Sequence, residues 1–222
     1  MKSPEPADAR ISIIGAGPGG LTCARILQQR GIAVTVYDRD PGRDFRNQGG
    51  TLDLHADHAQ VALREAGLLD EFFALARPEG QELRQMDPTG AITFHRFPEH
   101  WSPRMRQMIT ENDGLYIHRP IFVLPVSHTW DHNPTVTLLG DAAHLMPPLG
   151  TGVNLAMLDA VELALALANA ATADDAIRVY EKTMLPRSNE MAKAIEHGTE
   201  QLLSADSSAR KLSAIVADSL VK

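Results

Sequence analysis

The chain has 222 residues, of which 44% are hydrophobic, and a formal net charge of −7. Such a chain can bury the core of one globular domain, or of one domain with an appendage. The negative charge, the aromatic content of 5% and the lack of a long Lys or Arg run argue against a nucleic-acid-binding surface, so we expect small-molecule ligands.

The N-terminal segment predicts no secretion signal. Residues Met1–Arg10 include prolines and charges but no apolar core, and we expect no stretch of the chain to be long enough and apolar enough to cross a bilayer. The single cysteine, Cys23, excludes an intramolecular disulfide and falls in a helical pattern, where we expect it to pack in the core. We predict a cytoplasmic protein with no membrane or nucleic-acid partner.

The first predicted elements form a phosphate-binding turn. An apolar run, Ile11–Ile14, predicts a strand, and Leu21–Arg30 has helical spacing. In the glycine-rich turn between them, Gly15 permits a tight turn, Gly17 lets the backbone approach a phosphate, and Gly20 lets helix and strand pack closely. The helix then presents unpaired N–H groups and the positive end of its dipole to the anion.

A second predicted buried strand, Ile32–Tyr37, ends at Asp38, eighteen residues after Gly20. A carboxylate at this position can accept hydrogen bonds from the hydroxyls of an adenosine ribose. Strand, turn, helix, strand and acid in this order predict a dinucleotide site. The alternative for the glycines is a tight connection between strand and helix that binds no ligand. The alternative for Asp38 is a solvated position at the end of the strand.

Loops, short helices and a hairpin are predicted next. The loop at Arg39–Gly50 is polar, and its arginines are either solvated or bind a ligand. His55 and His58 have no second cluster of metal-binding residues nearby, so we predict no metal site. The predicted elements are a loop at Arg39–Gly50, a short alternating segment at Thr51–Leu54, helices at Ala59–Ala66 and Leu68–Ala76, and a hairpin of Glu82–Met86 with Ala91–His95.

The segment from Arg96 to Trp130 is irregular and rich in proline, and periodic patterns return after it. They predict a buried strand at Thr135–Leu139 that runs into Gly140 and Asp141, an apolar helix at Leu155–Ala168 after a glycine turn, helices at Asp174–Met184 and Ser188–Leu203 separated by Pro186, and a short helix at Ala209–Val221.

Several separated segments together resemble one known family. They are Ile13–Leu21, Val36–Asp40, Gly49–His55, Ala66–Leu69, Gly140–Pro148 and Gly152–Asn154. In these motifs and in their order the chain resembles the class A flavin-dependent monooxygenases, and within them most of all the tetracycline-inactivating enzymes. The resemblance implies FAD as the cofactor and NADPH or NADH as the reductant.

The resemblance also implies roles for individual residues. Asp38 would hold the adenosine ribose, Arg39 would lie near the adenine, Asp53 would contact FAD, and Arg46 would face the nicotinamide dinucleotide. Asp141 would accept a hydrogen bond from a ribityl hydroxyl.

The segment from Pro147 to Asn154 would lie beside the isoalloxazine, with Pro148, Gly152 and Asn154 as its cofactor-binding residues. A turn at a helix N-terminus can offer backbone N–H groups to the pyrimidine edge of a flavin. The pattern favours a structural role for His144, because flavin hydroxylation draws its reactivity from the cofactor. It identifies no catalytic residue.

The fold class implied is α/β: a Rossmann-like FAD-binding domain with a mostly parallel sheet, discontinuous in sequence, followed by C-terminal helices. The expected organisation is the N-terminal half of the FAD domain at 1–95, a shortened connection at 96–130, the C-terminal half at 131–170 and the C-terminal helices at 171–222. The family's central region, which includes the sheet over the substrate, is not recognisable, and the join is expected between Phe97 and Arg104. Apolar surface left exposed there would favour a homodimer or a partner subunit.

Two functions follow as hypotheses. The first is an FAD-dependent, NAD(P)H-using monooxygenase of small aromatic or polyketide-like molecules such as tetracyclines. The alternative is a truncated flavin-binding remnant or interaction module without hydroxylase activity. A dehydrogenase that uses a nicotinamide alone is disfavoured by the late Gly140-Asp141 motif.

Overall fold

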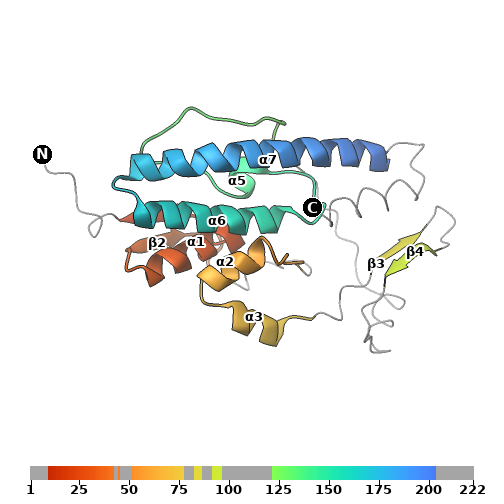
Figure 1. Ribbon diagram of the computed structural model, residues 1–222, viewed down its shortest axis with the longest axis horizontal. Helices are drawn as coiled ribbons and strands as arrows, with labels where there is room; N and C mark the ends of the chain where they lie inside the picture. The colour runs from red at the N-terminus through yellow and green to blue at the C-terminus, as the bar shows by residue number, and fades with distance from the viewer. Residues whose placement is uncertain are drawn as a thin grey trace, which may run out of the picture. The chain divides into compact units, whose positions relative to one another are not determined.

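The computed structural model describes residues 10–42, 45, 52–77, 83–86, 92–96 and 122–203 (Figure 1). The chain divides into two compact units. The first combines Met1–Phe73 with Phe122–Glu196, and the second combines Ala74–Ile121 with His197–Lys222. Two stretches far apart in sequence therefore build the first unit, which contains both predicted cofactor motifs.

The described elements agree with an α/β chain. The strands are β1 (Ile11–Ile14), β2 (Val34–Tyr37), β3 (Leu83–Met86) and β4 (Ile92–Arg96). The helices are α1 (Pro18–Gln29), α2 (Ala59–Glu65), α3 (Leu69–Leu75), α5 (Asp141–His144), α6 (Gly152–Asn169) and α7 (Ala173–Leu203).

Strands β1 and β2 pair in parallel, with Ile11 opposite Val34 and Ile14 opposite Tyr37, and α1 connects them. Successive side chains of a strand point to opposite faces of a sheet. Ile11, Ile13 and Val34 accordingly pack on the core, whereas Ile14 and Tyr37 are exposed. This β1–α1–β2 unit is the arrangement that the sequence predicts, with α1 beginning three residues earlier.

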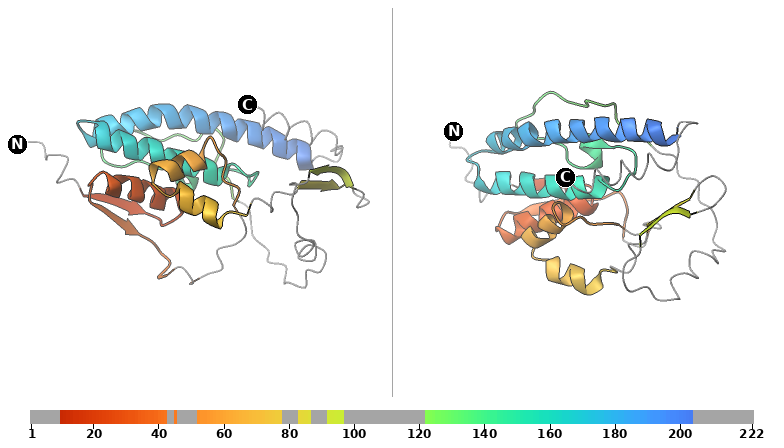
Figure 2. Two further views of the ribbon diagram at one scale, coloured as in Figure 1. Left: turned by 60° about the horizontal axis from the view of Figure 1, so that its bottom comes forward. Right: turned by 45° about the vertical axis from the view of Figure 1, so that its right-hand side comes forward.

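Helix α6 forms the centre of the first unit. It lies between α1 on one side and α7 on the other (Figures 1 and 2). Eight of its residues are buried: Asn154, Leu155, Met157, Asp159, Ala160, Val161, Leu163 and Ala164. With 18 residues and a mean hydropathy of 1.3, α6 is long and apolar enough to span a membrane, so the prediction that no segment has this character is wrong. Half of the helix is buried inside the unit, and packing against α1 and α2 accounts for its composition.

The predicted strand at Thr135–Leu139 does not form. Side chains bind its backbone instead: the Asn133 Oδ1 atom accepts hydrogen bonds from the N–H groups of Thr135 and Val136, and the Tyr180 hydroxyl donates to the carbonyl of Leu138. Asparagine commonly competes with sheet pairing in this way.

The predicted break at Pro186 is also absent, because α7 continues through that residue. A proline inside a helix removes a hydrogen bond and costs about 3 kcal/mol. Tertiary contacts on both sides of Pro186 oppose this cost, since Met184 and Ser188 are buried and Arg187 pairs with two carboxylates of α6.

Two further predictions are confirmed. Strands β3 and β4, in the second unit, pair antiparallel with Leu83 opposite Arg96, as the predicted hairpin requires. The Cys23 thiol is buried in the core of the first unit, and burial raises its pKa to about 12. The predicted helix at Ala209–Val221 lies outside the described residues.

Candidate functional site

The glycine-rich turn connects β1 to α1. Gly15 has a φ of +112°, a conformation that favours glycine, and its N–H donates to the carbonyl of Tyr37 at 2.7 Å. Gly17 immediately precedes α1 and provides no side-chain cap, and Pro18 occupies the first helical position. The turn is therefore fastened to the end of β2 while the N-terminus of α1 carries no capping side chain.

The glycines of this turn differ in what surrounds them. A Cβ atom added to Gly20 would lie 2.2 Å from the carbonyl oxygen of Gly15, so only glycine fits at this approach of helix and turn. A Cβ added to Gly17 would meet nothing within 4 Å. The structure thus gives Gly20 the packing role that the sequence predicts, and it leaves open space beside Gly17 for a ligand.

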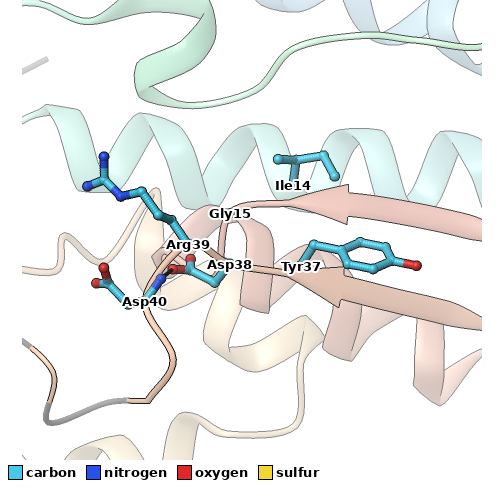
Figure 3. Close-up of a pocket in the computed structure, with 6 residues that line it drawn as sticks. All are labelled: Ile14, Gly15, Tyr37, Asp38, Arg39 and Asp40. Carbon is cyan, nitrogen blue, oxygen red and sulfur yellow. Dashed lines mark hydrogen bonds between the residues drawn. The ribbon is translucent and has the colours of Figure 1, made fainter.

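Asp38 joins the turn to the loop that follows β2. Its carboxylate accepts a hydrogen bond from the Ala16 N–H at 2.6 Å and another from the Asp40 N–H at 2.8 Å. Around it lies a pocket of about 500 Å³ at the carboxyl ends of β1 and β2 (Figure 3). The lining residues are Ile14, Gly15, Tyr37, Asp38, Arg39 and Asp40.

The late motif forms a second tight turn. Gly140 has a φ of +60°, and a Cβ added to it would lie 3.0 Å from the Cβ of Ala156. Asp141 follows as the first residue of the short helix α5, and its side chain is exposed. Because the predicted strand does not form, Asp141 is presented by a glycine turn and a helix start rather than by a strand end.

Ala156, on α6, brings the two motifs together. A Cβ added to Gly19 would lie 2.8 Å from the carbonyl oxygen of Ala156, and Gly140 approaches the Cβ of the same residue. Helix α1 therefore crosses α6 where the late turn also packs. Two motifs about 120 residues apart in sequence meet on one residue of the central helix.

Asn154 connects the segment that contains Asp53 to α6. Its side-chain amide donates to the carbonyl oxygens of Asp53 and Gly150, and its Oδ1 atom accepts from the His55 N–H at 2.7 Å. The side chain is 2% exposed. Asn154 thus positions the backbone of Asp53, whose side chain is exposed.

The turn before α6 lies next to Asp141. Gly150 has a φ of +90°, Pro148 is exposed, and a Cβ added to Gly152 would lie 4.0 Å from the Asp141 Oδ1 atom. Like α1, helix α6 begins without a side-chain cap, since Thr151 makes no capping hydrogen bond. The predicted residue Arg46 lies outside the described residues.

His144 belongs to a buried network that the sequence does not predict. Its Nε2 atom lies 2.5 Å from the Asp159 Oδ2 atom, and Asp159 also pairs with Arg187, which pairs with Glu162 as well. A structural role for His144, which the sequence favours, fits this burial. The available signal for the network was Asp159, a charged residue within the apolar run of α6. Its partners His144, Gly140 and Arg187 are 15, 19 and 28 residues away in sequence.

Three side chains near the start of α2 form the candidate metal group of the described residues. Ligand atoms of His55, Asp57 and His58 lie within 4.8 Å of one another, and the His58 Nδ1 atom lies 2.9 Å from the Asp57 Oδ1 atom. The 2.9 Å separation is that of a hydrogen bond, and it is shorter than the ~3.3 Å between two ligands of a tetrahedral zinc ion with bonds of about 2.0 Å. The sequence-based prediction of no metal site remains a prediction.

Comparison with known proteins identifies the family. The FAD binding domain family matches residues 8–115 and 125–194, which is most of the chain. The chain belongs to this family. The match includes both turns described above, so the expected flavoprotein family is confirmed.

Individual relatives agree with this assignment. The chain is 36% identical over 75 residues to the FAD-dependent monooxygenase thnD of Trichoderma harzianum, covering 34% of this chain and 16% of that protein. It is 33% identical over 142 residues to the monooxygenase penA of Penicillium thymicola, covering 54% of this chain and 31% of that protein. The chain therefore spans less than a third of the length of each of these relatives.

The fold has a similar solved structure, that of PqsL from Pseudomonas aeruginosa in complex with 2-aminobenzoylacetate. The TM-score is 0.55 at 16% identity, covering 85% of this chain and 95% of that chain. The expected α/β flavoprotein fold is thus confirmed.

Proposed function

We propose that this chain binds FAD across its two glycine turns, with the adenosine end at Asp38 and the flavin end at Asp141. The observation that carries the proposal is the approach of Gly19 and Gly140 to the same residue, Ala156. A dinucleotide needs both ends of its site held in one rigid frame, and α6 supplies that frame.

The residues present fit the cofactor. The first N–H groups of a helix have no partner within it, and both α1 and α6 begin without a side-chain cap. The open space beside Gly17 admits the pyrophosphate of FAD to the N-terminus of α1. The N-terminus of α6, near Asp141, similarly offers N–H groups to the pyrimidine edge of the flavin.

Charge at the adenosine end favours FAD over a 2′-phosphorylated nucleotide. Asp38, Arg39 and Asp40 line the pocket, so two carboxylates outweigh one guanidinium and disfavour a phosphate on the ribose, whereas a ribose hydroxyl can donate to Asp38. Arg39, on the same loop, is available to the adenine. This chain's residues thus bind and orient the cofactor, while the transfer of electrons from a reduced nicotinamide to oxygen is the cofactor's own chemistry.

The activity that we propose is NAD(P)H-dependent monooxygenation of a small aromatic or polyketide-like molecule, of which the tetracyclines are one class. The support for it is the family assignment and the names of the monooxygenase relatives. The alternative is a flavin-binding module without hydroxylase activity of its own. The cytoplasmic location and a homodimer or partner subunit remain proposals of the same kind.

One experiment separates these functions. Purified protein is saturated with FAD, and NADPH or NADH is added in air while the flavin absorbance and hydrogen peroxide are followed. Bleaching and reoxidation of bound flavin would support a redox enzyme and justify a substrate screen. Bound flavin that neither reductant bleaches would support the flavin-binding module.

A further inference from the structure

We propose that Asp159 is a positioning residue, which holds the Gly140–Asp141 turn in the conformation that binds the flavin end of FAD. The inference rests on the proposed function above. It concerns a residue of α6 that lies outside both glycine motifs.

Asp159 binds both ends of the short helix α5. Its Oδ2 atom accepts a hydrogen bond from the Gly140 N–H at 3.0 Å and lies 2.5 Å from the His144 Nε2 atom. Gly140 precedes α5 and His144 is its last residue, so one carboxylate oxygen fixes the start and the end of the helix. Asp141 lies between these two points and is exposed.

The His144 ring depends on this contact for its orientation. The ring is buried, and its Nδ1 atom has no hydrogen-bond partner in the described part of the chain. Among the described residues, the Asp159 carboxylate is therefore the one hydrogen-bonding group that orients the imidazole, with Nε2–H as the donor. Loss of that carboxylate would release both the ring and the Gly140 amide.

A charged residue at this position calls for an explanation. Asp159 is fully buried, and its charge is balanced by Arg187, whose guanidinium lies 2.8 Å from the Asp159 Oδ1 atom and also pairs with Glu162. Buried ion pairs are often no more stabilising than apolar residues of the same volume. An apolar residue, however, cannot bind the Gly140 N–H, so the contact with the turn distinguishes aspartate from the alternatives.

The structure provides a matched pair of variants. Asp159→Asn keeps the shape but has a single acceptor oxygen, and the cationic Arg187 guanidinium attracts that oxygen and repels the NH₂ group, so the NH₂ group faces the Gly140 and His144 donors. Glu162→Gln also removes one negative partner of Arg187 but has no contact with the turn among its described hydrogen bonds. Both variants weaken the link between α6 and α7, and only Asp159→Asn releases the turn.

The test measures the affinities of wild type, Asp159→Asn and Glu162→Gln for FAD and for ADP-ribose, which occupies the adenosine end alone. For Asp159→Asn we expect FAD affinity to fall tenfold or more, the visible circular dichroism of bound FAD to change, and ADP-ribose affinity to stay within twofold. Glu162→Gln should bind both ligands like wild type. An Asp159→Asn variant that binds FAD like wild type, or loses both ligands equally, would overturn the inference.

Failure of the proposed function has a different signature, which is wild-type protein that does not bind FAD. If Asp159→Asn does not fold, amide exchange in the wild type provides the test. A slowly exchanging Gly140 amide, with a proton resonance shifted downfield by the carboxylate, is expected. Fast exchange at Gly140 in the folded protein would overturn the inference without any variant.

Discussion

Gly19 and Ala156 approach so closely that a Cβ atom on Gly19 would lie 2.8 Å from the carbonyl oxygen of Ala156 and equally near the Leu139 Cδ1 atom. This contact joins the first cofactor motif to the helix that supports the second. It makes the packing of α1 on α6 a condition for the whole site.

The first prediction concerns this crossing. Gly19→Ala should destabilise the protein by about 1–2 kcal/mol, because overpacking against a backbone oxygen costs about 1–3 kcal/mol and alanine recovers at most about 1 kcal/mol of helix propensity. Gly17→Ala is the matched control, since its φ of −72° suits alanine and its Cβ meets nothing within 4 Å. Urea unfolding should therefore show Gly17→Ala to be as stable as wild type, while its FAD affinity falls. If the two variants are equally stable, α1 does not contact Ala156 of α6 at Gly19.

The second prediction concerns Asp38. Asp38→Ala should lower the affinity for ADP-ribose and for FAD by tenfold or more, because it removes both a ribose acceptor and the hydrogen bonds to the Ala16 and Asp40 amides. Isothermal titration with each ligand measures the effect. Asp40→Ala, which changes another residue in the lining of the same pocket, should have the smaller effect, and the reverse order would show that the ribose is held elsewhere.

A third prediction follows from Asn154. Asn154→Ala removes three hydrogen bonds to the backbone of Asp53, His55 and Gly150, and we expect the free energy of unfolding to fall by about 2–3 kcal/mol, since buried groups lose their partners. Asn169→Ala is the control, because the Asn169 side chain is exposed and bonds only within its own helix. Denaturant titration that gives the same loss for both variants would be evidence against the link between the Asp53 segment and α6.

The fourth prediction is a pH dependence of stability centred on His132. Its hydrogen bonds with Glu181 and with Asp174 raise the pKa of the imidazole above its ordinary 6.5. This contribution is complete below pH 6.5 and is lost as the pH rises through the raised pKa.

The carboxylates that face His132 have the opposite dependence. Burial opposes the ionisation of Glu181, but hydrogen bonds from His132, Thr137 and Trp130 outweigh it and lower its pKa, and the hydrogen bond from His132 lowers that of Asp174. Their contributions are complete above pH 4.5 and are lost as the pH falls. The melting temperature of the wild type should thus decline above neutral pH, and His132→Gln should abolish that decline. If the melting temperature of the wild type does not change up to pH 9, the hydrogen bonds of His132 with Glu181 and Asp174 do not have this role.

The parts of the site that the sequence predicts are those with local signals. The order of β1, the glycine turn, α1, β2 and Asp38 follows from the apolar runs and from glycines that the structure requires at Gly15 and Gly20. Each of these signals lies within a few residues of the element that it specifies, so one pass along the chain finds it.

The remaining parts depend on distant partners. The backbone of Thr135–Leu139 has a strand pattern, but the side chains of Asn133 and Tyr180 bind it. The ion pairs of Arg187 with α6 stabilise α7 next to Pro186. Periodicity reports the local preference of a segment but not the side chains that compete for its backbone. For the same reason Asp159 escaped prediction, since its role exists only once α5, α6 and α7 are packed together.

Binding of FAD and of ADP-ribose to the wild-type protein, measured side by side, shows whether one molecule of FAD spans the two turns. We expect one FAD per chain, a visible spectrum perturbed from that of free flavin, and an affinity for FAD at least tenfold above that for ADP-ribose, because the late turn contributes to binding. Equal affinities for the two ligands, with the flavin spectrum unchanged, would show that the late turn does not hold the flavin.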